Sequence, residues 1–169
     1  MTMVTQSSIN VLFVCLGNIC RSPTAHGVFE QLVRDAGLAQ RISVDSAGTG
    51  DWHIGRGPDP RACQAALRKG VDISSLRARQ VARDDFSRFD YVLAMDRANL
   101  AELERMKPQS FEGYLGLFLP FAAEAGGGLD EVPDPYFGEL DGFESVYQLV
   151  HSASSGLLRH LRDQLDELA

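Results

Sequence analysis

A short run of apolar residues near the start of the chain constrains the fold more than any other feature. Residues 9–15 read INVLFVC, with apolar side chains at nearly every position instead of every second one. A strand with this pattern is buried on both faces, which is typical of a parallel sheet covered by helices on each side. After a short loop, apolar residues recur at 3.6-residue spacing from about Pro23 to Gly37. We therefore expect a strand, a loop and a helix over residues 9–37.

Strand and helix patterns alternate along the rest of the chain. We expect further strands at 42–48 and 89–96, a weaker strand candidate at 115–121, and helices at 60–70, 97–106 and from 141 onward. This alternation predicts an α/β fold, with one domain, a four-stranded parallel sheet and helices on both faces, of the Rossmann-like or flavodoxin-like kind. The domain is expected to span residues 1–169, with residues 1–8 flexible. Ligands in such folds bind beyond the carboxyl ends of the strands, so the loop after residue 15 is a candidate site.

Composition and charge limit the classes of partner and compartment. The net charge of −7 argues against nucleic acid, because phosphate backbones attract clustered Lys and Arg. Arginine makes up 14 of the 16 basic residues, so a local positive site in an acidic protein stays open. The three cysteines fit neither a disulfide framework nor a zinc-ligand spacing, and the longest apolar run is too short to span a membrane. We expect a reduced, cytoplasmic protein that binds no nucleic acid, no membrane and no metal.

The loop after the first strand gathers residues with a specific chemistry. Five residues separate Cys15 from Arg21, Gly17 and Asn18 tolerate unusual backbone angles, and Ser22 opens the following helix. A loop of this composition can turn its amide N–H groups inward onto one anion, and the helix N-terminus adds positive potential. The planar guanidinium can grip two oxygens of a tetrahedral oxyanion. The sequence therefore predicts a phosphate-binding loop with a thiol at its base.

The same electrostatic field favours the thiolate form of Cys15, which would lie directly below a bound phosphorus. A phosphocysteine intermediate needs a separate proton donor for the leaving oxygen. The segment VPDPYFG supplies Asp134, whose backbone is restricted by a proline on each side. Two alternatives stay open at this point. Cys15 can be a small apolar residue in an ordinary turn with Arg21 solvated, and Pro-Asp-Pro-Tyr can be a plain turn.

Four segments together resemble the low-molecular-weight protein tyrosine phosphatase family. They are VLFVCLGNICRSPTA, DSAGTGDWHIGRGPDPRA, the stretch ARQV…DDFSRFDYVLAMDRANL, and DPYFG, in the family's order from about residue 9 to residue 165. In this family the thiol loop is N-terminal and the acid lies near the C-terminus, whereas other Cys-x5-Arg phosphatases generally carry the acid before the thiol. The resemblance implies a phosphatase I-like fold. It also implies hydrolysis of phosphotyrosine in proteins and of aryl phosphates through a phosphocysteine intermediate, with no metal and no other cofactor.

The resemblance implies a role for each matching residue. Cys15 would be the nucleophile, Arg21 the phosphate clamp, and Asp134 the general acid that later activates water. Ser22 would hydrogen-bond the thiolate and ease its departure from phosphorus. The other implied contributors are the backbone amides of Leu16, Gly17, Asn18, Ile19 and Cys20 around the phosphate, Trp52 and Tyr136 stacked on an aromatic ring, and Asn18 and Ser46 as braces behind the loop. Taken alone, Trp52 is equally a packing residue.

The implied partners are a phosphotyrosine protein as substrate and inorganic phosphate as product and inhibitor, with the chain a monomer or a weak dimer. The chain departs from the family pattern at Leu76, where a His is frequent, and at Phe137, where a second Tyr is frequent. These departures concern a supporting network and a modification site. His26 stands where a Glu is common and is expected on the surface. Asp96 is expected to cap the helix that follows it.

Two other functions compete with the phosphatase. An arsenate reductase of similar fold passes oxidation from the first Cys to two further cysteines about seventy residues downstream, and this chain has none there. A silent phosphate-binding module would be expected to lack Cys15 or Asp134, and both are present. The second loop cysteine, Cys20, has two interpretations. It can fill space behind the loop, or it can capture oxidised Cys15 as a disulfide and so protect it from overoxidation.

Overall fold

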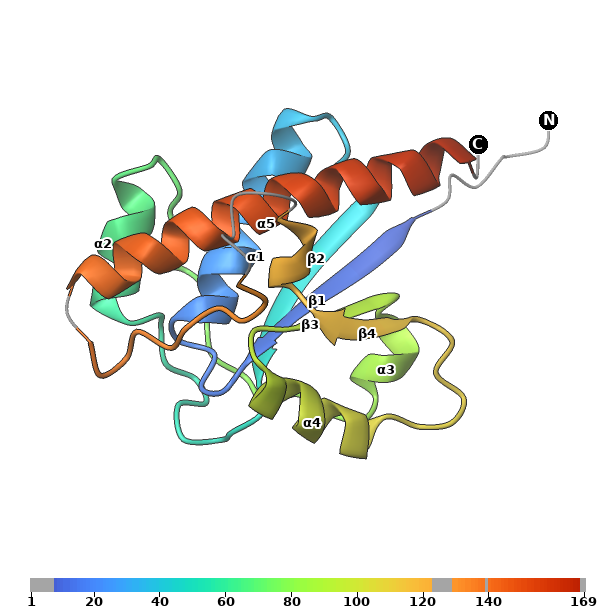
Figure 1. Cartoon of the computed structure of the whole chain (residues 1–169), viewed down its shortest axis with the longest axis horizontal. Coiled ribbons are helices and arrows are strands. Elements are labelled where there is room, and N and C mark those ends of the chain that lie inside the picture. The colour runs from blue at the N-terminus through green and yellow to red at the C-terminus, as the bar shows by residue number, and fades with distance from the viewer. Residues whose placement is uncertain (1–7, 123–128, 139, 168–169) are drawn as a thin grey trace.

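The structure, a computed structural model, describes residues 8–122, 129–138 and 140–167, without the side chain of Leu140. Residues 1–7, which make up most of the segment expected to be flexible, lie outside the described residues. The elements in chain order are β1 (Ile9–Cys15), α1 (Arg21–Asp35), β2 (Ile42–Gly48), α2 (Pro60–Leu67), α3 (Asp85–Arg88), β3 (Tyr91–Ala94), α4 (Arg97–Met106), β4 (Tyr114–Leu117), the 3-10 turn η1 (Leu119–Phe121) and α5 (Leu140–Glu167) (Figure 1).

The four strands form one parallel sheet in the order β2-β1-β3-β4. The α/β class with a four-stranded parallel sheet is therefore confirmed. The third and fourth strands are shorter than the sequence pattern predicts, since only residues 91–94 and 114–117 pair with their neighbours in the sheet. Residues 119–121 of the predicted fourth strand form η1, where Pro120 cannot donate to a strand ladder.

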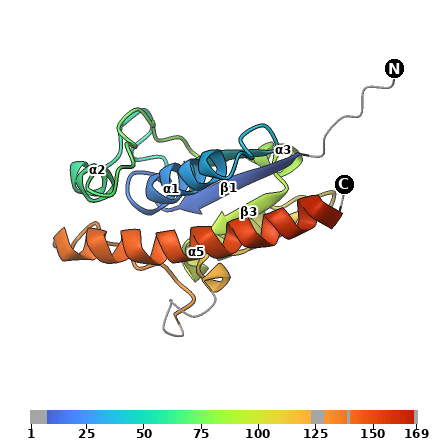
Figure 2. The same ribbon diagram turned by 90° about the horizontal axis from the view of Figure 1, so that it is seen from above.

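Alternate residues of β1 pack on opposite faces of the sheet, which explains its unbroken apolar pattern. Val11 and Phe13 belong to the larger core cluster, with side chains from α1, α2 and α5, and the Phe13 ring meets Phe29 edge to face. Leu12 and Val14 belong to a second cluster on the other face, with residues of α3 and α4. Figure 2 shows α5 running along the length of the molecule. The described part of the chain thus has the predicted layers, helices on both faces of a buried sheet.

The chain leaves β1 toward β2 on one side and later returns to β3 on the other. This reversal of direction creates a crevice beyond the carboxyl ends of the strands. Cys15, at the end of β1, pairs with Gly48 of β2, and Val14 pairs with Ala94 of β3. The residues that follow these ends, 16–20, 49–53 and 95–96, therefore meet at one edge of the sheet. The candidate site lies there.

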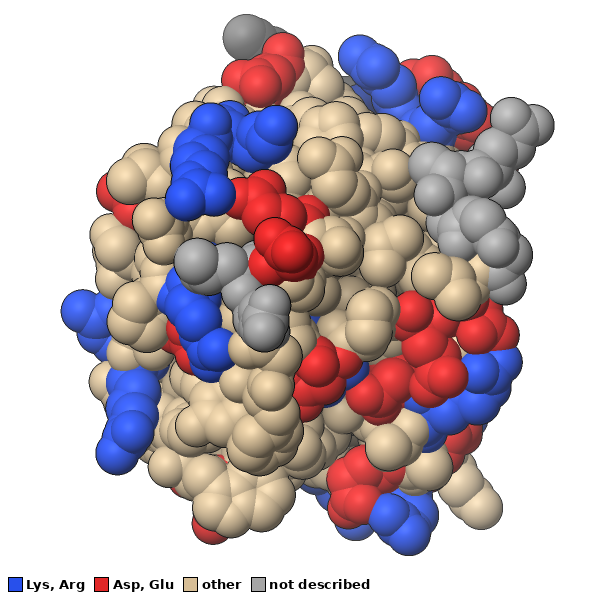
Figure 3. All heavy atoms as spheres, turned by 60° about the vertical axis from the view of Figure 1, so that its left-hand side comes forward, with Lys and Arg blue, Asp and Glu red and all other residues tan. Residues whose placement is uncertain are grey.

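The surface of the described residues carries charges of both signs. Figure 3 shows the side of the molecule on which α2 lies, where Asp and Glu side chains are interspersed with Lys and Arg. No broad area of positive charge is visible among the residues drawn in colour on this face. Within the described ranges, none of the helices combines the length and the apolar character needed to cross a membrane.

Candidate active site

The loop between β1 and α1 turns its carbonyl groups outward. The carbonyl oxygens of Cys15, Leu16, Ile19 and Cys20 accept hydrogen bonds from the backbone N–H groups of Thr49, Gly50, Asp59 and Thr24 respectively. In a trans peptide the N–H of the next residue points opposite to the carbonyl. Several loop N–H groups therefore point away from these outer partners, toward the centre of the loop. Because α1 begins at Arg21, its N-terminus adds positive potential at the same centre.

Asn18 fixes the sharpest bend of this loop. Its φ is +57°, a left-handed conformation that asparagine adopts more readily than most residues. The side-chain oxygen accepts a hydrogen bond from the backbone N–H of Arg79 at 3.0 Å, and Nδ2 donates to Ser22 Oγ at 2.8 Å. Gly48 lies against the same bend, and a Cβ there would be 2.7 Å from the carbonyl oxygen of Leu16. The bend thus depends on one asparagine and one close glycine.

The sulfur of Cys15 lies at the base of the loop. Cys15 as a whole is buried, with 2% of its surface exposed. The backbone N–H of Asn18 donates to Sγ at 3.3 Å, and Ser22 Oγ lies 3.0 Å from Sγ. Ser22 can also donate to the carbonyl oxygen of Ala47, at the longer distance of 3.4 Å. Asn18 Nδ2 already donates to the Ser22 oxygen, so the Ser22 proton is directed to one of these two acceptors. The 3.0 Å distance places the Ser22 hydroxyl where it can donate to the Cys15 sulfur.

Arg21 is buried and held by groups from distant parts of the chain. Nη1 donates to Asp96 Oδ2 at 2.6 Å and to the carbonyl oxygen of Val132 at 3.0 Å, and Nη2 lies 3.6 Å from Asp134 Oδ2. Burial lowers the pKa of Arg21, but the negative charges of Cys15, Asp96 and Asp134 outweigh this effect, and the pKa is raised. Arg21 is therefore a fixed cation beside the thiol and the candidate acid.

Asp96 has a role that its sequence position did not reveal. The prediction that it caps the following helix is confirmed, since it forms a capping box with Asn99 at the start of α4. The structure adds the ion pair with Arg21, which joins the end of β3 to the loop after β1. The sequence did contain one signal for this contact. Asp96 is a carboxylate directly after β3, the strand that lies beside β1.

The acid loop, residues 133–138, is held by a second residue that sequence reasoning missed. Asp134 Oδ1 accepts a hydrogen bond from the N–H of Tyr136, and the Asp134 side chain is 40% exposed. Arg61 of α2 donates to the carbonyl oxygens of Tyr136 and Gly138 at 2.9 and 3.1 Å. Asp59, the N-cap of α2, in turn holds Arg61 by two hydrogen bonds to its guanidinium. The tether connects α2 to the loop that carries the candidate acid.

Cys15, Arg21 and Asp134 line a single pocket of about 220 Å³, whereas Asn18, Ser22, Ser46 and Asp96 do not belong to its lining. Its lining residues are Cys15, Leu16, Gly17, Ile19, Cys20, Arg21, Trp52, His53, Asp134, Tyr136 and Phe137. The predicted thiol, clamp, acid and aromatic walls are thus brought together. Trp52 is 67% exposed, which argues against a packing role. His53, which the sequence analysis did not single out, lies so close to Gly17 that a Cβ there would be 2.9 Å from its ring.

Phe137 departs from the frequent family tyrosine and is 95% exposed. Its ring meets Tyr136 edge to face, with 4.8 Å between centroids. Leu76, the other departure, is partly buried against the apolar core. Phe137 therefore extends the aromatic surface of Tyr136 at the pocket, and Leu76 contributes packing.

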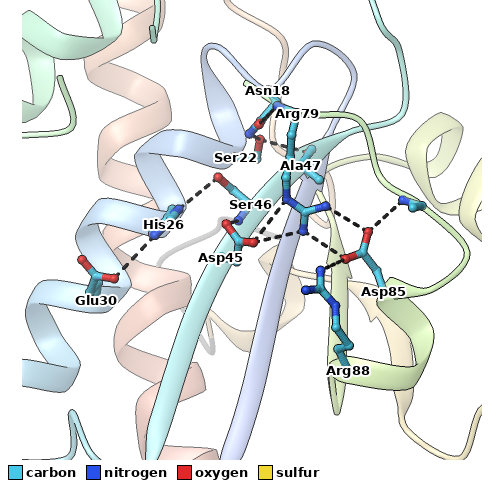
Figure 4. Close-up of polar contacts among 11 residues, drawn as sticks. Asn18, Ser22, His26, Glu30, Asp45, Ser46, Ala47, Arg79, Asp85 and Arg88 are labelled. Carbon is cyan, nitrogen blue, oxygen red and sulfur yellow. Dashed lines mark hydrogen bonds and ion pairs between the residues drawn. The ribbon is translucent and has the colours of Figure 1, made fainter. Parts of the chain in front are cut away.

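A polar network lies behind the loop, and it corrects one expectation (Figure 4). His26, expected on the surface, is 8% exposed, with Nδ1 3.0 Å from Ser46 Oγ and Nε2 3.5 Å from Glu30. The expectation failed because α1 packs its His26 position against β2. Burial lowers the pKa of His26 below its usual value of 6.5, against the opposing effect of the Glu30 carboxylate. Two residues were expected to brace the loop from behind. The side chain of Ser46 contacts His26, whereas the side chain of Asn18 contacts Ser22 at the loop itself.

All three cysteines are free thiols. Cys20, which is buried, lines the pocket beside Cys15. Burial, followed by the negative charge of Asp59, raises the pKa of Cys20 far above its usual value. Cys20 is therefore a neutral thiol near neutral pH. Cys63 of α2 is partly buried and donates weakly to the carbonyl oxygen of Pro58. Among the described residues, no group of three or more His, Cys, Asp or Glu side chains is placed to hold a metal ion.

The parallel α/β sheet whose first strand ends in the Cys-x5-Arg loop agrees with the phosphatase I-like fold that the sequence resemblance implies. Residues 10–167 match the sequence model of the family described as "Low molecular weight phosphotyrosine protein phosphatase". A low molecular weight protein-tyrosine-phosphatase of Streptomyces coelicolor is 46% identical over 160 residues, which cover 92% of this chain and 95% of that protein. The chain therefore belongs to the low molecular weight phosphotyrosine protein phosphatase family, a family of hydrolases.

Solved structures support the same assignment. A protein tyrosine phosphatase from Entamoeba histolytica superposes with a TM-score of 0.87 at 35% identity, covering 93% of this chain and 99% of that chain. A Drosophila protein described as an arginine phosphatase superposes with a TM-score of 0.82 at 34% identity, covering 89% of this chain and 96% of that chain. The same fold therefore occurs in one protein described as a tyrosine phosphatase and in another described as an arginine phosphatase.

Proposed function

We propose that this chain hydrolyses phosphotyrosine in proteins, and aryl phosphates generally, through a phosphocysteine intermediate and without a metal ion. The observation that carries the proposal is the convergence of Cys15, Arg21 and Asp134 on one pocket, beside a loop whose carbonyl oxygens accept hydrogen bonds from other parts of the chain. A thiol, a fixed guanidinium and a carboxyl group are the three groups that this reaction needs. The three free cysteines agree with action in a reducing compartment such as the cytoplasm.

In the first step, the Cys15 thiolate attacks phosphorus and forms the S–P bond while the bond to the phenolic oxygen breaks. Asp134 gives its proton to that oxygen, so a phenol leaves. Arg21 and the loop amides hold the three equatorial oxygens, where charge is spread in the transition state. Asp96 keeps the guanidinium oriented for this contact.

In the second step, the Asp134 carboxylate takes a proton from a water molecule, whose oxygen attacks phosphorus. The S–P bond breaks and its electron pair returns to sulfur. Ser22 stabilises the thiolate as it leaves, because its hydroxyl lies 3.0 Å from Sγ. Inorganic phosphate is the product and, since it fits the same loop, an inhibitor.

The pocket walls favour an aromatic leaving group. Trp52, Tyr136 and Phe137 present ring surfaces around the mouth of the pocket, and a phosphotyrosine ring can stack on them. A phosphoarginine substrate would place a guanidinium in the same position, and a test of function must therefore include it. The two other candidates are less well supported. Arsenate reduction needs a cysteine pair downstream that the sequence lacks, and a silent module would not keep both Cys15 and Asp134 in the pocket.

The test is turnover of p-nitrophenyl phosphate, a phosphotyrosine peptide and a phosphoarginine peptide in EDTA, by the wild-type chain and Cys15→Ser. We expect EDTA to leave the rate unchanged and the phosphotyrosine peptide to be the better peptide substrate. Cys15→Ser should lose activity, because a hydroxyl does not ionise comparably at neutral pH. Rapid quenching should trap phosphate on Cys15. Metal-dependent activity, or more than roughly a few per cent of the wild-type rate in Cys15→Ser, would contradict the proposal.

A further inference from the structure

Arg79 contacts the loop from behind, at the residue that forms its bend. The Arg79 backbone N–H donates to Asn18 Oδ1, and Asn18 Nδ2 donates to Ser22 Oγ (Figure 4). Ser22 Oγ in turn lies 3.0 Å from the sulfur of Cys15. Arg79 also accepts a hydrogen bond on its carbonyl oxygen from the N–H of Gly48. The main chain at Arg79 therefore joins the end of β2 to the bend of the loop.

Two carboxylates fix the side chain of Arg79. Asp85 of α3 receives both Nη1 and Nη2 at 3.1 Å, and Asp45 of β2 lies 3.0 Å from Nη2 and accepts from Nε at 3.2 Å. Asp85 is 1% exposed and also accepts from the N–H of Ala82 and from Arg88. Burial raises the pKa of Asp85, but the hydrogen bonds from Arg79, Ala82 and Arg88 outweigh it and lower the pKa. Asp85 is therefore an ionised anchor inside the protein.

We infer that Arg79 is a positioning residue for the reaction. Its guanidinium, held between Asp45 and Asp85, fixes the Arg79 amide on Asn18, and Asn18 then orients the Ser22 hydroxyl toward the Cys15 sulfur. No step of this relay touches the substrate. The network outside the pocket thus sets how well the thiolate is stabilised within it. The inference rests on the proposed phosphocysteine mechanism.

The two chemical steps depend on this hydrogen bond in opposite ways. When Cys15 attacks phosphorus, a hydrogen bond from Ser22 makes the thiolate more stable and gives no help to the attack. When the S–P bond breaks, sulfur is the leaving group, and the same hydrogen bond lowers the barrier. Loosening Asn18 and Ser22 should therefore slow hydrolysis of the intermediate and leave its formation nearly unchanged. In kinetic terms, kcat falls and KM falls with it, while kcat/KM changes little.

The experiment compares Arg79→Gln, Asp45→Asn and Arg88→Gln in steady-state and rapid-mixing kinetics with p-nitrophenyl phosphate. Asp45→Asn keeps the Oδ1 acceptor for the N–H of Ser46 but removes the charge that faces Arg79. Arg88→Gln is the matched control, since it removes a hydrogen bond to the same Asp85 carboxylate from a residue with no described contact to the loop. We expect kcat to fall about fivefold or more in Arg79→Gln and about twofold in Asp45→Asn. In both, kcat/KM should stay within about twofold of wild type, and the phosphorylated enzyme trapped by acid should increase.

Arg88→Gln should keep the wild-type kcat. Equal losses of kcat and kcat/KM in the Arg79 and Arg88 variants would indicate a merely structural role and overturn the inference. Unchanged kcat in Arg79→Gln would also overturn it. If Arg79→Gln does not fold, Asp45→Asn decides by the same criteria. The two failures can be told apart. If the wild type forms phosphocysteine and the variants behave as the wild type does, only this inference is contradicted. If the wild type forms no phosphocysteine, the proposed function is contradicted.

Discussion

Asp96 Oδ2 lies 2.6 Å from Nη1 of Arg21, although 75 residues separate the two in the sequence. The same carboxylate accepts the N–H of Asn99 through Oδ1 and so caps α4. Asp96 therefore uses one carboxylate oxygen to cap α4 and the other to hold Arg21. This division predicts that the two roles can be separated by substitution.

Asp96→Asn should preserve the cap and weaken the clamp. Asparagine keeps a side-chain oxygen for the Asn99 N–H and is among the best N-cap residues, but it loses the charge that orients Arg21. Because a hydrogen bond to a charged group contributes roughly 1.5–3 kcal/mol, we expect kcat to fall about tenfold with little change in Tm. Asn99→Ala is the control, since it breaks the capping box without contacting Arg21, and it should lower Tm but not kcat. A normal rate in Asp96→Asn would show that Val132 alone is enough to hold the guanidinium.

Asp134→Ala should reveal proton donation through its dependence on the leaving group. Phenols of low pKa scarcely need a proton, whereas poor leaving groups do, and general acid catalysis contributes roughly 10²–10⁴-fold. The rate loss should therefore be large for phenyl phosphate and much smaller for dinitrophenyl phosphate when phosphorylation of Cys15 is measured directly. Asp130→Ala, which removes a nearby carboxylate paired with Arg97, is the control and should change neither. An equal loss for all leaving groups would indicate a structural role for Asp134.

Trp52→Ala should reduce the preference for aromatic substrates. The indole is exposed at the rim of the pocket, and stacking on an aromatic ring contributes about 0.5–1.5 kcal/mol. We expect KM to rise more for phenyl phosphates than for small alkyl phosphates. Ile54 is also exposed but does not belong to the pocket lining, so Ile54→Ala should leave the ratio of the two KM values unchanged. If that ratio stays constant in Trp52→Ala, the ring does not contact the substrate.

The sequence was sufficient for elements whose pattern is local. The unbroken apolar run of β1, the spacing of apolar residues in α1 and the capping carboxylate of α4 each report on a few neighbouring residues, and all three are confirmed. Cys15 and Arg21 were candidates because of the loop after the first strand. Asp134 was a candidate because of the Pro-Asp-Pro-Tyr turn, and the family pattern connected the three. The structure places them in a common pocket.

The residues that were missed act across large sequence separations. Asp96, Arg61 and Arg79 each reach a loop 60 or more residues away, and nothing in their own neighbourhood signals which partner they meet. His26 was misplaced for a related reason. A histidine at a position where a Glu is common is expected on the surface, but the serine that contacts its ring lies on β2, 20 residues away. Pairing of this kind is determined by the packing of α1 on the sheet and not by the helical pattern.

His26 should make the protein less stable on mild acidification. Its folded-state pKa is lowered by burial, so between this value and the usual 6.5 the unfolded chain binds more protons than the folded chain. Its contribution to stability is therefore present above pH 6.5 and is lost as the pH falls through the folded-state pKa. The charged groups that face His26 are Glu30, Asp45 and Arg79.

The measurement is Tm between pH 7.5 and pH 5.5 for the wild type, His26→Gln and the control His151→Gln, which replaces an exposed histidine of α5. Glutamine can still hydrogen-bond Ser46 but does not titrate, so the loss of Tm on acidification should be smaller in His26→Gln by a few degrees. About 1 kcal/mol changes the Tm of a chain of this size by roughly 2–4 °C. Identical pH profiles in all three proteins would show that His26 does not control acid stability.

The second cysteine of the loop predicts reversible inactivation by peroxide. Cys15 and Cys20 both line the pocket as free thiols. Peroxide would convert the Cys15 thiolate to a sulfenic acid, and the Cys20 thiol would displace water from it to form a disulfide. Because the pKa of Cys20 is raised by burial, capture should be faster at alkaline pH, where more of the attacking thiolate is present. Dithiothreitol should restore activity, and bound phosphate should protect Cys15.

Cys20→Ser should keep the untreated rate within about twofold but recover far less activity after peroxide, because the sulfenic acid of Cys15 would proceed to irreversible forms. Cys63→Ser is the matched control, since this thiol lies on α2 outside the pocket lining, and it should recover like the wild type. Peptide mass spectrometry should detect a Cys15–Cys20 disulfide in the wild type and the Cys63 variant. Equal recovery in Cys20→Ser and the wild type, without that linked peptide, would leave Cys20 as a packing residue behind the loop.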